Sequence, residues 1–170
     1  MTIINSNKQP LVSVIINCFN GEEYLDDAIN SVLNQTYLNF EIIFWDNQSQ
    51  DKSSKKINSY NDSRIKYFYS KEHTLLGEAR NLAIECANGE LLAFLDIDDT
   101  WEKNKLERQV PLFNDDKTVL VYCDSYSFNN KGTKKLLSKS KKFYRGKCFK
   151  NLLLDYFLVM SSTMIRKKTL

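Results

Sequence analysis

Several features of membrane and secreted proteins are missing from this sequence of 170 residues. No apolar run approaches the roughly 18 residues of a membrane-spanning helix, and the first ten residues lack the apolar stretch of a signal peptide. The four cysteines are far apart and form no C-x-x-C pair, which indicates neither a zinc ribbon nor a disulfide framework. We therefore expect a soluble cytoplasmic protein with reduced thiols.

Acidic residues are missing from one segment of the chain. Residues 131–150 carry nine Lys or Arg residues and no Asp or Glu, although the net charge of the whole chain is only +3. This pattern is typical of a solvated basic surface, and it also suits an anionic lipid, an acidic acceptor or a nucleic acid. We keep peripheral membrane contact through residues 131–160, at the inner face of the membrane, as an alternative to the solvated surface. We expect no nucleic acid partner.

Histidine is nearly absent, which excludes a histidine-rich metal site. The single His73 follows Lys71 and Glu72, and these neighbours predict an exposed loop. The composition is otherwise ordinary, with 42% apolar and 26% charged residues. Such a chain is long enough for one domain with a well-filled core.

Strand and helix patterns alternate along the first hundred residues. This alternation predicts an α/β fold with a mostly parallel sheet flanked by helices, joined by right-handed crossovers. Beyond residue 110 the pattern is less regular and α+β, and the apolar run at 149–160 favours a core helix leading into a strand over an interfacial segment. The expected strands are 11–17, 40–45, 65–69, 91–95 and 119–122, and the expected helices are 22–35, 53–60, 79–87 and 106–113.

Three carboxylates, Asp96, Asp98 and Asp99, come directly after the predicted strand 91–95. In open α/β sheets, ligands bind at the carboxyl ends of the strands, so this position suits a site. Adjacent carboxylates repel one another, and a hard divalent cation with a phosphate behind it relieves that repulsion. The alternative is ordinary turn and helix-cap chemistry, which is also rich in aspartate.

An ordered set of short motifs resembles the family 2 glycosyltransferases of the GT-A fold. Single pieces are weak, but their order across residues 12–110 is specific, and the similarity continues more loosely to residue 170. The motifs are V-I-I-N-C-F-N at 14–20, S-V-L-N-Q-T at 31–36, D-N-Q-S-Q-D at 46–51, A-R-N at 79–81 and F-L-D-I-D-D-T-W at 94–101.

The resemblance implies transfer of a sugar from a nucleotide diphosphate donor, usually a UDP-sugar, to an acceptor hydroxyl with inversion. It implies Mn²⁺ or Mg²⁺ on the diphosphate, and a glycan or lipid-linked acceptor. A cation there offsets the negative charge that the leaving diphosphate gains.

The same resemblance assigns site residues for the nucleotide. Phe19 and Asn20, with Glu22 nearby, would border it, and Asp46 would accept a hydrogen bond from the imide N–H of the base. Arg80 would stabilise phosphate or stack on the base, with an exposed helix arginine as the alternative.

The acids after the fourth strand receive separate roles. Asp96 would lie near the ribose and the metal, and Asp98 would be a direct metal ligand. Asp99 is either a third metal ligand or a cap of the following helix.

This sequence departs from the family pattern in two places. Asn47 and Gln48 replace the acid and glycine of the commoner D-D-G-S form, which leaves the preference for UDP open. No acidic pair follows residue 117, so the general base is expected beyond Leu170. We expect one incomplete domain over residues 1–170, with a nucleotide-binding half at 1–110 and the start of an acceptor-side half at 111–170.

Two other functions remain open on the sequence. One is a sugar nucleotidyltransferase, which also combines a nucleotide fold with metal-binding acids but usually has a glycine-rich phosphate loop. The other is a module that binds a nucleotide sugar without turning it over.

Overall fold

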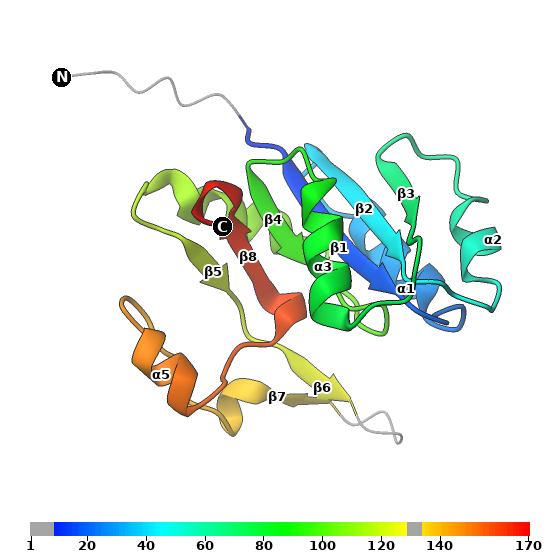
Figure 1. Ribbon diagram of the computed structural model, residues 1–170. Helices are drawn as coiled ribbons and strands as arrows, with labels where there is room; N and C mark the ends of the chain where they lie inside the picture. Colours follow the sequence, from blue (N-terminus) through cyan, green and yellow to red (C-terminus); the bar gives the residue numbers. More distant parts are fainter. Residues whose placement is uncertain (1–8, 129–133) are drawn as a thin grey trace.

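A six-stranded sheet carries helices on both of its faces (Figure 1). The structure is a computed structural model that describes residues 9–128 and 134–170. Elements labelled η are short 3-10 helices. The elements follow in the order β1 (Val12–Cys18), α1 (Leu25–Leu33), β2 (Phe40–Asp46), α2 (Ser53–Ile57), β3 (Ile65–Tyr69), α3 (Leu76–Glu85), β4 (Leu91–Phe94), α4 (Lys105–Gln109), η1 (Val110–Asn114), β5 (Leu120–Tyr122), β6 (Tyr126–Phe128), β7 (Lys134–Leu136), η2 (Leu137–Lys139), α5 (Phe149–Leu154), η3 (Met160–Ser162), β8 (Thr163–Arg166) and η4 (Lys167–Thr169).

The first four strands form the parallel part of the sheet. They lie in the order β3-β2-β1-β4, and every neighbouring pair among them is parallel. β8 and then β5 continue the sheet beyond β4, and both of these pairings are antiparallel. β6 and β7 form a separate antiparallel pair. The prediction of a mostly parallel sheet is therefore confirmed, together with the less regular α+β portion that follows it.

β1 lies inside the parallel part, and helices cover both of its faces. Val14 and Ile16 belong to the same buried cluster as Ile29 of α1, whereas Ile15 belongs to a second cluster with Ala83 of α3. Successive side chains on a strand point to opposite faces, so a continuous apolar run is what two covering layers require. The carboxyl end of β1 therefore lies in the middle of the sheet edge where the loops meet.

α1 and α2 are shorter than their apolar spacing predicts, whereas α3 begins three residues before the predicted 79–87 and ends two residues earlier. The helical pattern begins at Glu22, but α1 starts at Leu25 because residues 21–24 form a turn. The amides of Tyr24 and Leu25 both donate to the carbonyl of Gly21 in that turn. Within residues 9–128 and 134–170, no helix is long and apolar enough to cross a bilayer.

The expected core helix at 149–160 is wrong. α5 has six residues, and none of them is buried. In Figure 1 the helix lies apart from the six-stranded sheet, on the same side as β7. The first buried side chain after it is Phe157, which packs against the rings of Tyr122 and Tyr144 with centroids 5.5 and 5.1 Å away. Apolar content alone therefore did not indicate burial in this segment.

Candidate functional site

Hydrogen bonds join the loops that follow β1 and β2. The amide of Asn20 donates to Ser49 Oγ at 3.0 Å, and Asn20 Oδ1 accepts from the amide of Gln50 at 2.7 Å. The amide of Glu22 donates to Asp51 Oδ2 at 2.9 Å. Asn20 and Glu22, both predicted site residues, thus hold two loops together at one end of the sheet.

Two residues of these loops have left-handed backbone conformations. Asn20 has a φ of 54° and Gln48 a φ of 72°. Asparagine tolerates this region, whereas glutamine is strained in it by roughly 1–2 kcal/mol. The side chain of Gln48 donates to the carbonyl of Ser70 at 2.8 Å. Gln48 therefore adopts the backbone conformation that a glycine would take at its position, and the loop keeps a tight turn without one.

Asp46, at the end of β2, is fully buried. Its Oδ1 atom accepts from the amide of Ser49 at 2.7 Å, and its Oδ2 atom accepts from the hydroxyl of Tyr67 at 3.0 Å. A base could reach this carboxylate only if the surrounding side chains moved. The next residue, Asn47, lines an open pocket instead.

This small pocket, with a volume of about 320 Å³, lies at the carboxyl end of β1. Two rings border it, those of Phe19 and His73, with centroids 4.3 Å apart. The side-chain nitrogen of Asn17, Nδ2, also at the pocket, is buried and has no hydrogen-bond partner among the described residues. An unpaired buried donor costs roughly 1–3 kcal/mol, which a ligand with an acceptor oxygen would recover. The lining residues are Asn17, Cys18, Phe19, Asn47, His73, Thr74, Leu75, Leu76 and Ala79.

An ion pair connects α3 with the loop after β4. Arg80 Nη2 lies 2.9 Å from Asp96 Oδ1. Burial raises the pKa of the Asp96 carboxyl above its ordinary value; Arg80 opposes this effect, and Asp99 and Asp98 add to it. Because Arg80 follows Ala79 of the small pocket, the pair places a cation and a carboxylate beside that pocket.

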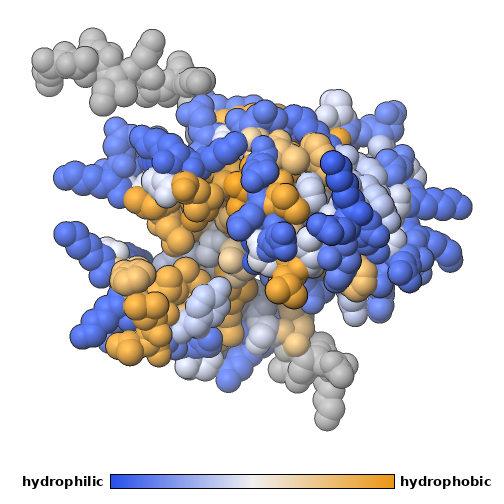
Figure 2. Space-filling view, in the orientation of Figure 1, coloured by the Kyte–Doolittle hydropathy of each residue, from blue (hydrophilic) through white to orange (hydrophobic). Residues whose placement is uncertain are grey.

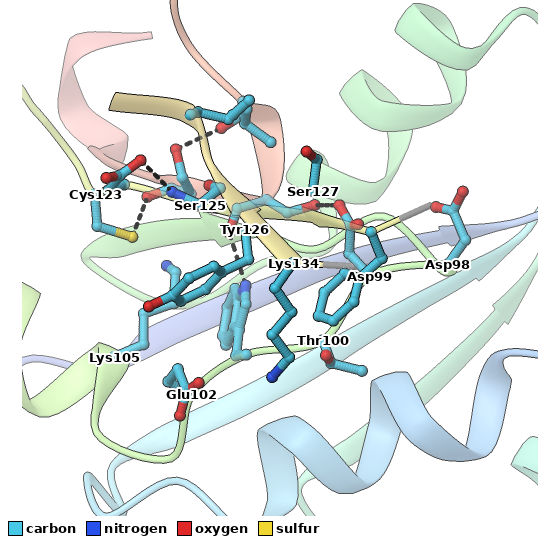
Figure 3. A pocket seen from close by; sticks show the side chains of 17 residues that line it. Asp98, Asp99, Thr100, Glu102, Lys105, Cys123, Ser125, Tyr126, Ser127 and Lys134 are labelled. Carbon is cyan, nitrogen blue, oxygen red and sulfur yellow. Dashed lines mark hydrogen bonds between the residues drawn. The ribbon is translucent and has the colours of Figure 1, made fainter. Parts of the chain in front are cut away.

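A large pocket, with a volume of about 610 Å³, is lined in part by residues 98–100 of the loop after β4, and we call residues 95–101 the acid loop. Figure 3 shows Asp98 and Asp99 on one side of the pocket and Cys123 on the opposite side. Asp98 is exposed, whereas Asp99 is partly buried and accepts a hydrogen bond from the hydroxyl of Ser161. Lys105 also lines this pocket, from α4, and its side chain is almost completely buried.

The carboxylates of Asp96 and Asp98 suit a metal ion whose remaining ligands come from substrate phosphates and water. Within the described parts of the chain, no three Cys, His, Asp or Glu side chains form a metal site by themselves. Mg²⁺ is commonly bound by one or two carboxylates together with substrate phosphates and water. Asp98 is exposed, and Asp96 uses Oδ1 for Arg80, so its Oδ2 remains for a cation. Both residues supply the hard oxygen donors that Mg²⁺ and Mn²⁺ prefer.

The structure brings the predicted residues to one edge of the sheet but into two pockets. Phe19 lines the small pocket and Asp98 the large pocket, and the Arg80–Asp96 pair joins α3, which also lines the small pocket, to the loop that carries Asp98. Sequence reasoning missed four residues of these pockets. They are Asn17, Asn47, Lys105 and Ser161.

A GT-A-like α/β domain is the class that this sheet and its loops define. A family model described as glycosyl transferase family 2 matches residues 13–170. The chain therefore belongs to this family.

Two named relatives illustrate this membership. The chain is 38% identical over 120 residues to the Escherichia coli UDP-Glc:alpha-D-GlcNAc-diphosphoundecaprenol beta-1,3-glucosyltransferase WfgD, a match that covers 71% of this chain and 47% of the relative. It is 41% identical over 107 residues to the Bacillus subtilis putative teichuronic acid biosynthesis glycosyltransferase TuaG, covering 62% of this chain and 42% of the relative. The chain thus spans less than half the length of either protein.

Solved structures share the fold. S. aureus TarS 1–349 in complex with UDP-GlcNAc has a TM-score of 0.72 and 20% sequence identity, covering 92% of this chain and 45% of that 1–349 chain. The Pyrobaculum calidifontis mannosyltransferase PcManGT in complex with GDP-Man and Mn²⁺ has a TM-score of 0.64 and 22% identity, covering 69% of this chain and 36% of that protein. At these identities the likeness shows the fold alone.

Proposed function

We propose that this chain binds the nucleotide diphosphate sugar of an inverting glycosyltransferase, with the base in the small pocket and the diphosphate beside the acid loop. The unpaired amide nitrogen of Asn17 carries the proposal, because it is a buried donor at a pocket bordered by the rings of Phe19 and His73. Such a site accepts a flat ring that bears a carbonyl oxygen. The complexes of TarS with UDP and with UDP-GlcNAc support a UDP-sugar as the donor.

The residues around the base have different tasks in this proposal. Phe19 packs against the base, while Asn20 and Glu22 hold the two loops that shape the pocket. Asp46 was predicted to accept the imide N–H of the base, and in the described conformation Asn47 is the neighbour that reaches the pocket. Asn47 Oδ1 already accepts from the amide and the hydroxyl of Thr74, and one hydrogen of Nδ2 is donated to the Thr74 carbonyl. We therefore assign to Asn47 a hydrogen bond from the second hydrogen of Nδ2 to a carbonyl of the base, and to Asp46 the support of the loop, where it accepts from the amide of Ser49.

A divalent metal completes the donor site. Asp98 and the free oxygen of Asp96 would hold Mn²⁺ or Mg²⁺ against the diphosphate. The bound cation would offset the charge of the leaving nucleotide. Arg80 would keep Asp96 oriented and place a positive charge next to a phosphate. The PcManGT complex contains Mn²⁺ together with GDP-Man, which supports a divalent metal for the donor.

The large pocket is the proposed acceptor site. Asp98 lines this pocket, and the side chains of Tyr126 and Phe128 offer apolar faces for a sugar ring. Burial raises the pKa of Asp124 in this pocket, but hydrogen bonds from Ser138 and Ser125 outweigh burial and lower it. A weakly basic carboxylate is a poor general base, so we assign that role to none of the pocket residues.

A lipid-linked glycan is the proposed class of acceptor. WfgD is named for an undecaprenol diphosphate acceptor, and TuaG for teichuronic acid biosynthesis. An acceptor of this class would place the protein at the inner face of the membrane.

Calorimetric titration with UDP tests the donor site. Binding should require Mn²⁺ or Mg²⁺, and Asp98→Ala should weaken it at least about tenfold, since a carboxylate ligand of the cation is lost. Asp116→Ala, which removes an exposed acid outside both pockets, is the matched control and should bind normally. Equal binding with and without metal would refute the donor site. Release of pyrophosphate from a nucleoside triphosphate and a sugar phosphate would instead favour a nucleotidyltransferase. Donor binding with no sugar transfer or hydrolysis, even in a protein that also carries the acidic pair expected beyond Leu170, would favour a binding module.

A further inference from the structure

Apolar side chains are exposed together on and just after α5. Phe149, Leu153 and Leu154 expose 74, 71 and 77% of their surface, and Tyr156 exposes 62%. Figure 2 shows the resulting hydrophobic area where Figure 1 places α5. A short helix with large exposed apolar side chains indicates a surface that meets an apolar partner.

The same segment is strongly cationic. Six exposed Lys or Arg side chains lie between residues 139 and 150, and the exposed Asp155 is the single acid from 134 to 156. We call residues 139–156 the basic apolar surface. Its cations are Lys139, Lys141, Lys142, Arg145, Lys147 and Lys150.

The basic apolar surface is anchored to the domain rather than loosely attached. The hydroxyl of Tyr122 in β5 donates to the carbonyl of Tyr144 and accepts from the amide of the same residue. The ring of Tyr122 also packs edge-on against Phe143, with centroids 5.5 Å apart, and Phe157 is buried beneath it. The surface therefore keeps one orientation relative to the large pocket, which Leu137 and Val159 line from either end of the same segment.

We propose that the basic apolar surface binds the anionic lipid face of a membrane. Lysine and arginine around an apolar helix are the features of an interfacial contact, in which apolar side chains enter the acyl boundary and cations meet lipid phosphates. A second copy of the chain would bring six further cations to the same place, and repulsion between like charges disfavours that partner. An apolar protein partner would give the cations no counter-charge.

This contact deepens the proposed function, and its relevance to an acceptor rests on that function. The large pocket would open close to the membrane, where the diphosphate of a lipid-linked glycan lies. The membrane contact itself is tested without any sugar transfer.

The test measures co-sedimentation of the 170-residue protein with phosphatidylcholine vesicles, with and without phosphatidylglycerol. The protein should bind only the anionic vesicles, and added salt should release it, because charge attraction is screened. The double substitution Lys141→Glu with Lys150→Glu should weaken binding more than about tenfold, since each cation contributes roughly fivefold. The control pair Lys55→Glu with Lys117→Glu changes the net charge equally at exposed positions elsewhere and should weaken it much less.

A second pair of variants tests the apolar part. Leu153→Ser with Leu154→Ser should weaken binding about tenfold or more, because two exposed leucines no longer enter the bilayer. Leu38→Ser with Leu112→Ser alters two exposed leucines outside the basic apolar surface and should have no effect. Equal binding to neutral vesicles, no binding to anionic vesicles, or equal effects of the control pairs would overturn the proposal.

Two further measurements separate this proposal from its rivals. If light scattering shows that the protein self-associates, and the leucine pair abolishes only that association, the surface is an interface between copies and the membrane proposal is wrong. UDP binding should be unchanged in all four double variants. If the native protein bound anionic vesicles but did not bind UDP, the proposed function would be wrong and the membrane proposal would stand.

Discussion

The hydroxyl of Ser161 donates a hydrogen bond to the carboxylate of Asp99. The same oxygen, Ser161 Oγ, accepts from the amide of Asp96 at 3.0 Å, and the carbonyl of Ser161 accepts from the indole of Trp101 at 2.7 Å. One residue of η3 therefore holds both ends of the acid loop. One carboxylate oxygen of Asp99 accepts this hydrogen bond. Asp98 also lines the large pocket, and its carboxylate has no such partner among the described residues.

Replacing Ser161 with alanine should loosen the acid loop. The variant loses two hydrogen bonds at partly buried positions, which should lower the free energy of unfolding by about 1–3 kcal/mol. UDP binding should need a higher Mn²⁺ concentration than it needs in the native protein, because the loop that carries Asp98 is held less firmly. Urea unfolding and calorimetry measure the two effects.

Ser162→Ala is the matched control for this prediction. Ser162 is a buried neighbour whose hydroxyl donates only to the carbonyl of Val159 at 2.7 Å. It should lose some stability but keep the metal dependence of UDP binding. If both variants lost that dependence to the same extent, the contact between Ser161 and Asp99 would have no special role.

Much of the fold follows from local patterns in the sequence. The apolar run before Asn17 predicts a strand buried on both faces, and β1 is such a strand. The alternation of strands and helices then predicts the parallel order. The helix limits were less predictable. α1 begins only at Leu25, because the residues from Gly21 to Tyr24 form a turn that backbone hydrogen bonds to the Gly21 carbonyl stabilise. α5 was misjudged because its leucines are exposed, and sequence alone does not say which apolar segment the sheet will cover.

The sequence predicts only those site residues that come directly after a strand. Asp96 and Asp98 follow β4 directly, so the topology places them at the ligand-binding edge. Ser161 is 62 residues away from Asp99 along the chain, and no spacing indicates their contact. The buried amide of Asn17 also gave no signal, because its lack of a partner is a property of the folded packing.

Glycine at position 89 should be required for folding. A Cβ atom there would lie 2.6 Å from the backbone nitrogen of Ser13 and 2.7 Å from the carbonyl oxygen of Leu11. Backbone atoms of a central strand cannot move aside cheaply, so Gly89→Ala should destabilise the protein by about 2 kcal/mol or more. Thermal unfolding measures the change.

Gly77→Ala provides the comparison for that substitution. Gly77 lies in α3, and a Cβ atom there meets nothing within 4 Å. Alanine should therefore raise the stability by roughly 0.5–1 kcal/mol. Similar destabilisation by both substitutions would show that steric contact with β1 is not the cause.

Glu41 should make the stability depend on pH in the acid range. Burial raises the pKa of its carboxyl, but hydrogen bonds from Lys66, Ser13 and Asn88 outweigh this and lower the pKa to about 2. A lowered pKa gives stability that is present above the unfolded value of 4.5 and is lost as the pH falls through about 2. Glu41→Gln should therefore cost about 2–3 kcal/mol at pH 7, with Lys66 half exposed and its contribution screened.

The difference between the native protein and Glu41→Gln should shrink as the pH falls from 4.5 towards 3. Urea unfolding at several pH values measures it. Glu107→Gln is the control, since Glu107 is an exposed carboxylate whose contact is with the hydroxyl of Thr36, and it should change the stability by less than about 0.5 kcal/mol. A constant difference between pH 7 and pH 3 would contradict the assignment.

Lys105 should make the stability depend on pH in the alkaline range. Its ammonium lies 4.1 Å from the centre of the Trp101 ring, and it donates to Gln109 Oε1 at 2.7 Å. Burial lowers the pKa of Lys105 to about 8. The unfolded chain, with an ordinary pKa of 10.5, then binds more protons between about pH 8 and 10.5 than the folded protein does, so folding becomes more favourable as the pH rises through that range.

Lys105→Met keeps the length of the side chain and removes this proton. Relative to the variant, the native protein should therefore gain stability between pH 8 and 10.5, by up to roughly 3 kcal/mol. Lys103→Met, at an exposed position, should show no such change. Because the thiol of Cys123 lies near Lys105 and also titrates at high pH, both comparisons should be repeated in a Cys123→Ser background. Parallel curves for the native protein and Lys105→Met in that background would mean that the amine is solvated, and the wall of the large pocket would then be more open than the packing of Trp101 against Lys105 indicates.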